Sequence, residues 1–130
     1  MAKINIPHGA QAKILIVEDD QDFLSILETK FTSEGFFVIT AQDGENGVIA
    51  AEKEKPDLVM SDVLMPKMDG LEMAKKIREF NKNVDIVFLS NLKDVDYTRK
   101  IEAGGYSSLM KSDLRISEIV DKIKAKLGVK

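Results

Sequence analysis

The chain has 130 residues, which is enough for one packed domain and too few for two of ordinary size. It carries 19 Lys and Arg against 22 Asp and Glu, a formal net charge of −3, and no basic block that could follow a nucleic-acid backbone, so direct nucleic-acid binding is not expected. The chain has no cysteine, which excludes disulfides, thiolate metal sites and a Cys nucleophile.

No apolar run in the sequence approaches the ~20 residues that a membrane-spanning helix needs. Residues 1–12 also lack the apolar core of a secretory signal. These features predict a cytoplasmic protein without membrane contact. We expect residues 1–12 to be a lead-in and residues 13–128 to form a single domain.

The first half of the chain alternates short apolar runs with helical patterns. Continuous apolar runs are typical of strands that are covered on both faces. In order, the pattern predicts a strand over Ile14–Val17, a helix that Asp20 caps and Gly35 ends, a strand over Phe36–Ala41, a helix over Gly44–Lys55 that Pro56 stops, and a strand from Leu58 to Asp62.

The second half repeats this alternation. It predicts a helix with apolar positions from Leu71 to Phe80, a strand over Val84–Leu89, a polar helix over Asp94–Ala103, a strand over Tyr106–Met110, and a last helix that Ser112 or Asp113 caps and that carries apolar residues from Ile116 to Leu127. Five strands that alternate with five helices are typical of an α/β fold with a parallel sheet.

Four of the predicted strands end on residues that can bind a metal ion or a phosphoryl group. These are Glu18 and Asp19 after the first strand, Asp62 at the third, Ser90 at the fourth and Lys111 at the fifth. The carboxyl ends of parallel strands lie along one edge of the sheet, so we expect these side chains to meet in one crevice. Each alone could be a turn residue, a helix cap or a solvated strand end, but that interpretation would have to hold at all four ends.

This set of side chains suits phosphoryl transfer to a carboxylate. Three carboxylates close together repel one another unless a hard cation neutralises them, and Mg²⁺ prefers oxygen ligands. Asp62 can act as the nucleophile, while the Ser90 hydroxyl and the Lys111 ammonium stabilise the phosphoryl oxygens. The pattern predicts a magnesium-dependent phosphoacceptor aspartate.

From about Lys13 to Leu127 the chain resembles the response-regulator receiver domain of two-component signal transduction, also described as a chemotaxis-regulator-like phosphoacceptor domain. The likeness rests on ILIVEDD (14–20), PDLVMSDVLMPKMDG (56–70), IVFLS (86–90) and AGGYSSLMK (103–111), and on the spacing D-x-x-M-P-x-x-D-G that begins at Asp62. The resemblance implies a flavodoxin-like fold, with a doubly wound five-stranded parallel sheet of order 2-1-3-4-5 and five helices.

The resemblance also implies roles for single residues and for partners. Asp62 would be the phosphorylation site, Ser90 and Lys111 would contact the phosphoryl group, and Mg²⁺ would be bound by Glu18, Asp19, Asp62 and the backbone carbonyl of Leu64. A sensor histidine kinase or a phosphotransfer protein would donate the phosphoryl group, and a downstream effector protein would respond. The domain would be a monomer or a weak phosphorylation-dependent dimer, and it would catalyse only its own phosphorylation and dephosphorylation.

Three positions depart from the family pattern. Asn91 replaces the usual small residue after the hydroxyl, Ser108 replaces the aromatic residue three positions before the lysine, and Ser112 replaces the proline after it. With no aromatic residue at 108, we expect the polar helix over 94–103 and the last helix to form the partner surface.

Other interpretations of the same residues remain open. One is a receiver-like protein-interaction module that signals without phosphorylation. Another is an aspartyl-nucleophile phosphatase, although that family has a second Asp two residues after the nucleophile, where this chain has Leu64. A flavodoxin is disfavoured, because acids after the first strand would repel the flavin phosphate.

Overall fold

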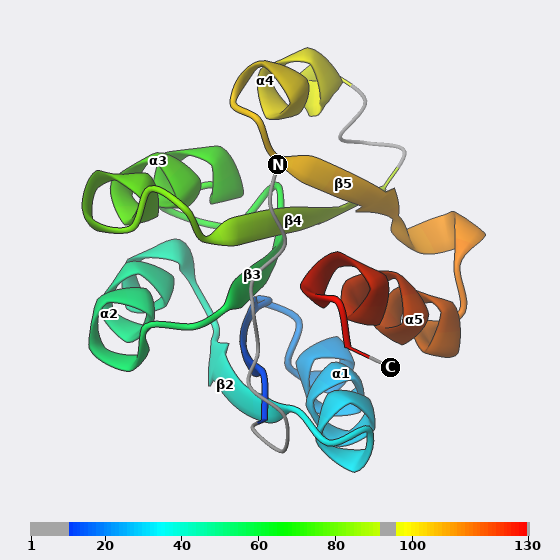
Figure 1. Ribbon diagram of the computed structural model, residues 1–130. Coiled ribbons are helices and arrows are strands. Elements are labelled where there is room, and N and C mark those ends of the chain that lie inside the picture. Colours follow the sequence, from blue (N-terminus) through cyan, green and yellow to red (C-terminus); the bar gives the residue numbers. More distant parts are fainter. Residues whose placement is uncertain (1–10, 92–95, 130) are drawn as a thin grey trace.

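The computed structural model describes residues 11–91 and 96–129, which form a parallel sheet with helices on both faces (Figure 1). The strands of this part are β1 (Lys13–Val17), β2 (Phe37–Ala41), β3 (Leu58–Asp62), β4 (Asp85–Ser90) and β5 (Ser107–Met110). They pair in parallel in the order β2-β1-β3-β4-β5. The predicted doubly wound 2-1-3-4-5 sheet is therefore confirmed.

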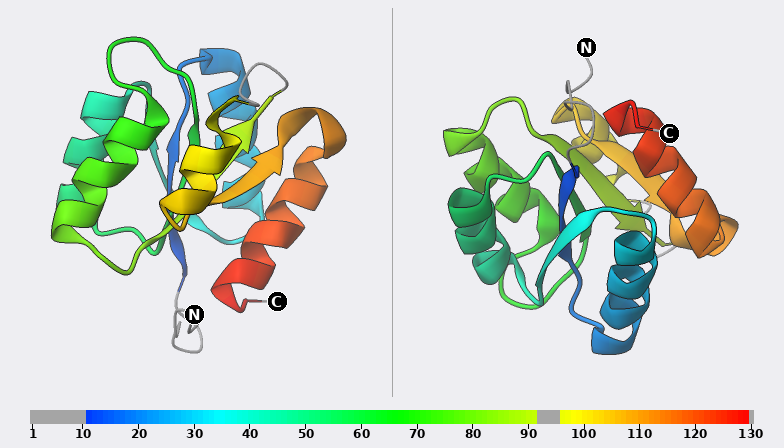
Figure 2. Two further views of the ribbon diagram at one scale, coloured as in Figure 1. Left: turned by 90° about the horizontal axis from the view of Figure 1, so that it is seen from above. Right: turned by 60° about the horizontal axis from the view of Figure 1, so that its bottom comes forward.

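The helices of the described part connect these strands. They are α1 (Gln21–Ser33), α2 (Gly44–Glu54), α3 (Gly70–Phe80), α4 (Thr98–Ala103) and α5 (Ile116–Leu127). In Figures 1 and 2, α1 and α5 lie on one face of the sheet, while α2, α3 and α4 lie on the other. No helix in residues 11–91 or 96–129 is long and apolar enough to cross a membrane.

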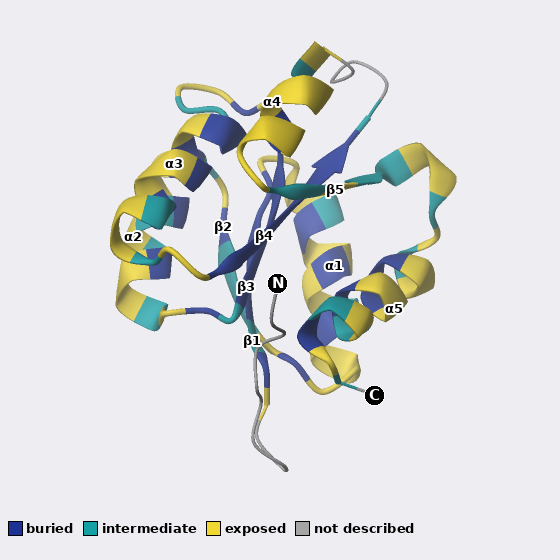
Figure 3. Ribbon diagram, turned by 45° about the horizontal axis from the view of Figure 1, so that its top comes forward, coloured by how far each residue is buried: buried dark blue, intermediate teal, exposed yellow. Residues whose placement is uncertain are grey.

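The apolar runs predicted as buried strands supply both hydrophobic cores. Successive side chains of a strand point to opposite faces of the sheet. Ile14 and Ile16 accordingly pack in the core under α1 and α5, whereas Leu15 and Val17 pack in the core under α2 and α3. Figure 3 shows the central strands as buried and the outer faces of the helices as exposed. The two cores hold the carboxyl ends of β1, β3 and β4 rigidly side by side.

Most predicted boundaries agree with the structure to within one residue, and the cap of α1 is confirmed. The Asp20 carboxylate accepts hydrogen bonds from the backbone N–H groups of Asp22 and Phe23. Gly35, with φ of +96°, lies just beyond the helix end. Ala12, assigned to the lead-in, is buried, and its carbonyl accepts the N–H of Phe37 at 2.9 Å. The domain limits of 13–128 stay a prediction.

The predicted cap of the last helix is wrong. Ser112 and Asp113 lie in a 3-10 turn, η2 (Lys111–Asp113), and α5 begins at Ile116. There the Glu118 carboxylate accepts the backbone N–H of Arg115 at 3.0 Å and satisfies the helix start instead.

The fourth helix is shorter than predicted. It begins at Thr98, after Tyr97, which provides no side-chain cap. The predicted start at Asp94 lies outside the described residues. Gly104 follows the last turn and Gly105 has a φ of +77°, so the predicted end at the two glycines is confirmed.

Candidate functional site

The four strand ends singled out in the sequence lie along one edge of the sheet. Asp62 is the last residue of β3 and Ser90 the last of β4, while Glu18 follows β1 and Lys111 follows β5 directly. Asp62 pairs in register with Leu89, so Ser90 lies one residue further along the neighbouring strand. The topology thus brings together residues that are up to 93 positions apart.

The three predicted acidic residues form one cluster. One carboxylate oxygen from each of Glu18, Asp19 and Asp62 lies within 4.8 Å of the other two. Glu18 is only 2% exposed and Asp62 8%, whereas Asp19 is exposed. The Glu18 carboxylate also accepts the backbone N–H of Asp20 at 3.0 Å, which fixes its orientation. Two of the three carboxylates are therefore buried, and the third, that of Asp19, faces the solvent.

Lys111 reaches across from β5 to this cluster. Its Nζ lies 2.5 Å from Oδ1 of Asp62 and 3.1 Å from Oε1 of Glu18. The same ammonium lies 4.8 Å from the centroid of the Phe23 ring. The sequence analysis did not include Phe23 among the site residues. Its position in the first turn after the acidic pair was the available signal that it borders the site.

The charges of the cluster influence one another. Burial and the neighbouring Glu18 carboxylate raise the pKa of Asp62 to about 8, and Lys111 only partly opposes them. Burial alone would raise the pKa of Glu18, but hydrogen bonds from Asp62 and the Asp20 backbone, together with Lys111, lower it below its ordinary value. Burial likewise disfavours the charged form of Lys111, yet its two ion pairs raise its pKa. Of the two buried carboxyl groups, Asp62 is therefore the one that keeps its proton to the higher pH.

This donor set fits a divalent cation. Mg²⁺ takes oxygen ligands and is commonly held by one or two carboxylates together with water and phosphate oxygens. Glu18, Asp19 and Asp62 supply three such oxygens, and the pKa of Asp62 is raised first by burial and then by the neighbouring Glu18 carboxylate. A cation bound among these oxygens would relieve that repulsion.

The structure gives fewer contacts for the other two candidate residues, Ser90 and Leu64. Ser90 is 8% exposed and is the last residue of β4. Leu64 lies two residues beyond Asp62, in the loop between β3 and α3, with its side chain 43% exposed. The assignment of its carbonyl as a metal ligand stays a prediction.

Gly70 closes the loop that follows Asp62. Its backbone N–H donates to the Val63 carbonyl at 2.7 Å. A Cβ at this position would collide with the Asp62 carbonyl and lie 2.7 Å from Cε1 of Phe88. Only glycine allows this approach, so the end of the D-x-x-M-P-x-x-D-G segment packs directly against the backbone of the candidate nucleophile.

Comparisons with known proteins identify the family of this chain. A family model described as the response regulator receiver domain matches residues 14–124. The chain is 39% identical over 87 residues to the alkaline phosphatase synthesis transcriptional regulatory protein PhoP of Bacillus subtilis, a match that covers 67% of the chain and 36% of that protein. It is 38% identical over 127 residues to the probable transcriptional regulator ycf27 of Porphyra purpurea, covering 90% of the chain and 52% of that protein.

Solved structures show the same likeness. The Vibrio cholerae chemotaxis protein CheY4 superposes with a TM-score of 0.83 at 27% identity, over 91% of this chain and all of that one (100%). A putative response regulator from Chloroflexus aurantiacus superposes with a TM-score of 0.82 at 28% identity, over 92% of this chain and 99% of the other. The chain spans about half or less of the length of the curated relatives that it matches.

Proposed function

Because this chain belongs to the response-regulator receiver domain family, we propose that it is a phosphoacceptor switch of two-component signalling, phosphorylated on Asp62. One observation carries the proposal. The Asp62 carboxyl group lies at the carboxyl edge of the sheet, inside an acidic cluster and in contact with Lys111. A lone structural aspartate would need neither the two further acids nor the half-buried Lys111 ammonium.

The reaction forms a bond between a carboxylate oxygen of Asp62 and phosphorus. The bond from phosphorus to the donor breaks, and the leaving group departs with its electron pair, which leaves an acyl phosphate on Asp62. Lys111 supplies positive charge to the phosphoryl oxygens, and Ser90 supplies a hydroxyl donor from the neighbouring strand. Attack requires deprotonated Asp62.

Mg²⁺ held by Glu18, Asp19 and Asp62 would supply the charge neutralisation that this chemistry needs. Of these residues, Glu18 provides a buried and fixed carboxylate, while Asp19 provides an exposed one. The carbonyl of Leu64 is included in this proposed ligand set.

The proposed phosphoryl donor is a histidine kinase or a phosphotransfer protein, and the proposed output is altered binding to an effector protein in the cytoplasm. Both named relatives are transcriptional regulators that are longer than this chain. The absence of direct nucleic-acid contact therefore stays a prediction for the present 130 residues alone. The monomer or weak dimer also stays a prediction.

Chemical labelling tests the proposal. Incubation with Mg²⁺ and acetyl phosphate should add one phosphoryl group, which tandem mass spectrometry should locate on Asp62. Asp62→Asn should abolish the label, whereas Asp121→Asn, which removes an exposed carboxylate from α5, should keep it. Labelling that continues unchanged in Asp62→Asn would refute the assignment.

The alternative is a receiver-like interaction module that does not use phosphorylation. Ser108 favours it, because this residue is exposed on β5 and cannot act as the family's aromatic switch residue. The labelling experiment distinguishes the phosphoacceptor switch from this alternative. The alternative predicts no label on wild-type protein and unchanged partner binding in Asp62→Asn.

A further inference from the structure

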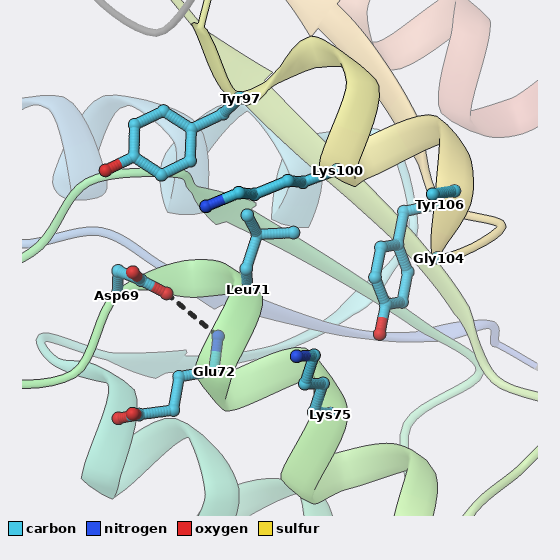
Figure 4. A pocket seen from close by; sticks show the side chains of 9 residues that line it. Asp69, Leu71, Glu72, Lys75, Tyr97, Lys100, Gly104 and Tyr106 are labelled. Atoms are coloured by element: carbon cyan, nitrogen blue, oxygen red, sulfur yellow. Dashed lines mark hydrogen bonds between the residues drawn. The ribbon is translucent and has the colours of Figure 1, made fainter.

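A groove of about 680 Å³ lies between α3 and α4 (Figure 4). None of the proposed phosphorylation or metal residues lines it. Its walls come from the start of α3, from α4 with the residue before it, and from the residue that precedes β5. The lining side chains used below are Asp69, Leu71, Lys75, Tyr97, Lys100 and Tyr106.

Tyr106 forms a fixed aromatic wall of this groove. Its ring makes an edge contact with Phe88, with centroids 5.5 Å apart and an interplanar angle of 88°. The guanidinium of Arg78 lies 5.1 Å from the centroid of the same ring. A Cβ on Gly104 would collide with this ring, so glycine at 104 leaves the space that the ring occupies. Together with Leu71 and Tyr97, Tyr106 can enclose one large apolar side chain.

The groove also offers two ammonium groups that form no ion pair within the described part of the chain. Lys75 and Lys100 are exposed, and neither forms a salt bridge with a carboxylate in residues 11–91 or 96–129. Figure 4 shows them extending from opposite walls. The Asp69 carboxylate is already engaged, because it accepts the backbone N–H of Glu72 at 2.8 Å as the cap of α3. The ammonium of Lys100 lies 5.5 Å from the centroid of the Tyr97 ring, and both ammonium groups can still pair with carboxylates of an incoming ligand.

We propose that this groove binds a protein segment in which an aromatic or large aliphatic side chain is flanked by carboxylates. The apolar side chain would enter between the tyrosine rings and Leu71, and the carboxylates would pair with Lys75 and Lys100. Because the carboxylates of Asp69 and Glu72 also line the groove, the carboxylates of the segment would have to lie beside the two lysines and away from the start of α3.

The position of the groove couples it to the proposed switch, and this coupling rests on the proposed function. Asp69 ends the loop that begins after Asp62, and Tyr97 follows the segment that begins after Ser90. Movement of the loop after Asp62 on phosphorylation would shift the α3 wall relative to the α4 wall. We expect an activating phosphoryl mimic to change the affinity for the segment by about 5-fold or more, the usual lower range of coupling between sites.

Tyrosine fluorescence provides a direct measurement. The chain has 2 Tyr and no Trp, and both tyrosines line the groove. Titration with a synthetic peptide that has one central Phe flanked by Asp and Glu should give a saturable change in emission. The same peptide with Asn and Gln in place of the acids should bind at least 10-fold more weakly.

Two charge-reversed variants locate the interaction. Lys75→Glu with Lys100→Glu should weaken binding of the acidic peptide at least 10-fold. Lys76→Glu with Arg99→Glu makes the same change in net charge at neighbouring exposed positions outside the groove, and should weaken it less than 2-fold. Equal weakening by both double variants would mean that only net charge matters, and would overturn the proposal.

Other outcomes overturn it as well. These are the absence of saturable binding by the acidic peptide, amide chemical-shift changes confined to α1 or α5, and tighter binding of ATP than of the peptide at the same amides. The titrations use unphosphorylated protein, so they do not depend on whether Asp62 is phosphorylated. If the protein is labelled on Asp62 but beryllofluoride leaves its affinity for the acidic peptide unchanged, only the proposed coupling is refuted and the peptide site is not.

Discussion

Replacing Asp62 by Asn should stabilise the metal-free protein at neutral pH, although it removes the proposed reactive group. Asp62 is 8% exposed and borders the charged Glu18 carboxylate. Burial and Glu18 raise its pKa from the ordinary 3.8 to about 8. Asn has nearly the same shape and carries no charge, so it removes this electrostatic cost.

The pKa difference sets both the sign and the size of the effect. Between about pH 4 and pH 8 the folded protein keeps the Asp62 proton while the unfolded chain has released it, so wild-type stability falls as the pH rises through this window. At pH 7 the cost is at most about 4 kcal/mol, from about three pH units at about 1.4 kcal/mol each. Loss of the contact with Lys111 offsets part of it, so we expect a net gain of about 1 to 3 kcal/mol.

Urea unfolding in EDTA at several pH values measures this gain. The difference between Asp62→Asn and wild type should grow from pH 5 to pH 8 and then become constant. The lowered pKa of Glu18 and the raised pKa of Lys111 add their own dependence below and above this window, respectively. Asp121→Asn, an exposed substitution on α5, should change stability by less than about 0.5 kcal/mol at every pH.

Two results would refute this reasoning. One is a variant that is less stable than wild type throughout the pH range, because Lys111 would then outweigh burial and repulsion. The other is a stability difference that does not depend on pH between 5 and 8. Added Mg²⁺ should stabilise wild type more than Asp62→Asn, since only the native cluster has all three carboxylates.

Three further substitutions test other parts of the site. Lys111→Met leaves the acids without their cation and should destabilise the metal-free protein by about 1 to 3 kcal/mol in urea unfolding. Gly70→Ala places a Cβ against the Asp62 carbonyl and should lower stability by about 2 kcal/mol or more, measured in the same way; an unchanged midpoint would show that the loop can move aside. Asp19→Asn should weaken Mg²⁺ binding in calorimetry about 10-fold and raise metal-free stability, whereas Asp20→Asn, which can still cap α1, should leave Mg²⁺ affinity unchanged.

Local pattern was sufficient to predict the elements of this protein and the residues that meet at one edge of its sheet. Continuous apolar runs such as Ile14–Val17 indicate strands that are buried on both faces, and their alternation with helical patterns allows only a parallel sheet with helical connections. Because such a sheet aligns the carboxyl ends of its strands, the proximity of Glu18, Asp62 and Lys111 followed from their positions after apolar runs.

Helix starts were less predictable where several polar residues compete. Ser112 and Asp113 are both suitable caps, yet the chain after Lys111 first makes a 3-10 turn and α5 starts at Ile116. The start depends on which turn allows the apolar face of α5 to pack on β1 and β3, with Ile119 and Ile123 in that core. Packing between elements decides this, and the cap residues adapt to it.

Only the tertiary structure decided how the site residues interact and where a partner could bind. Whether Lys111 pairs with Glu18 as well as Asp62, and which carboxyl group keeps a proton, depends on distances and burial that spacing along the chain does not contain. The groove between α3 and α4 likewise exists because Tyr106 packs on Phe88 from another strand. Periodicity reports which face of an element is buried, whereas pKa values and grooves arise from contacts between elements that are distant in sequence.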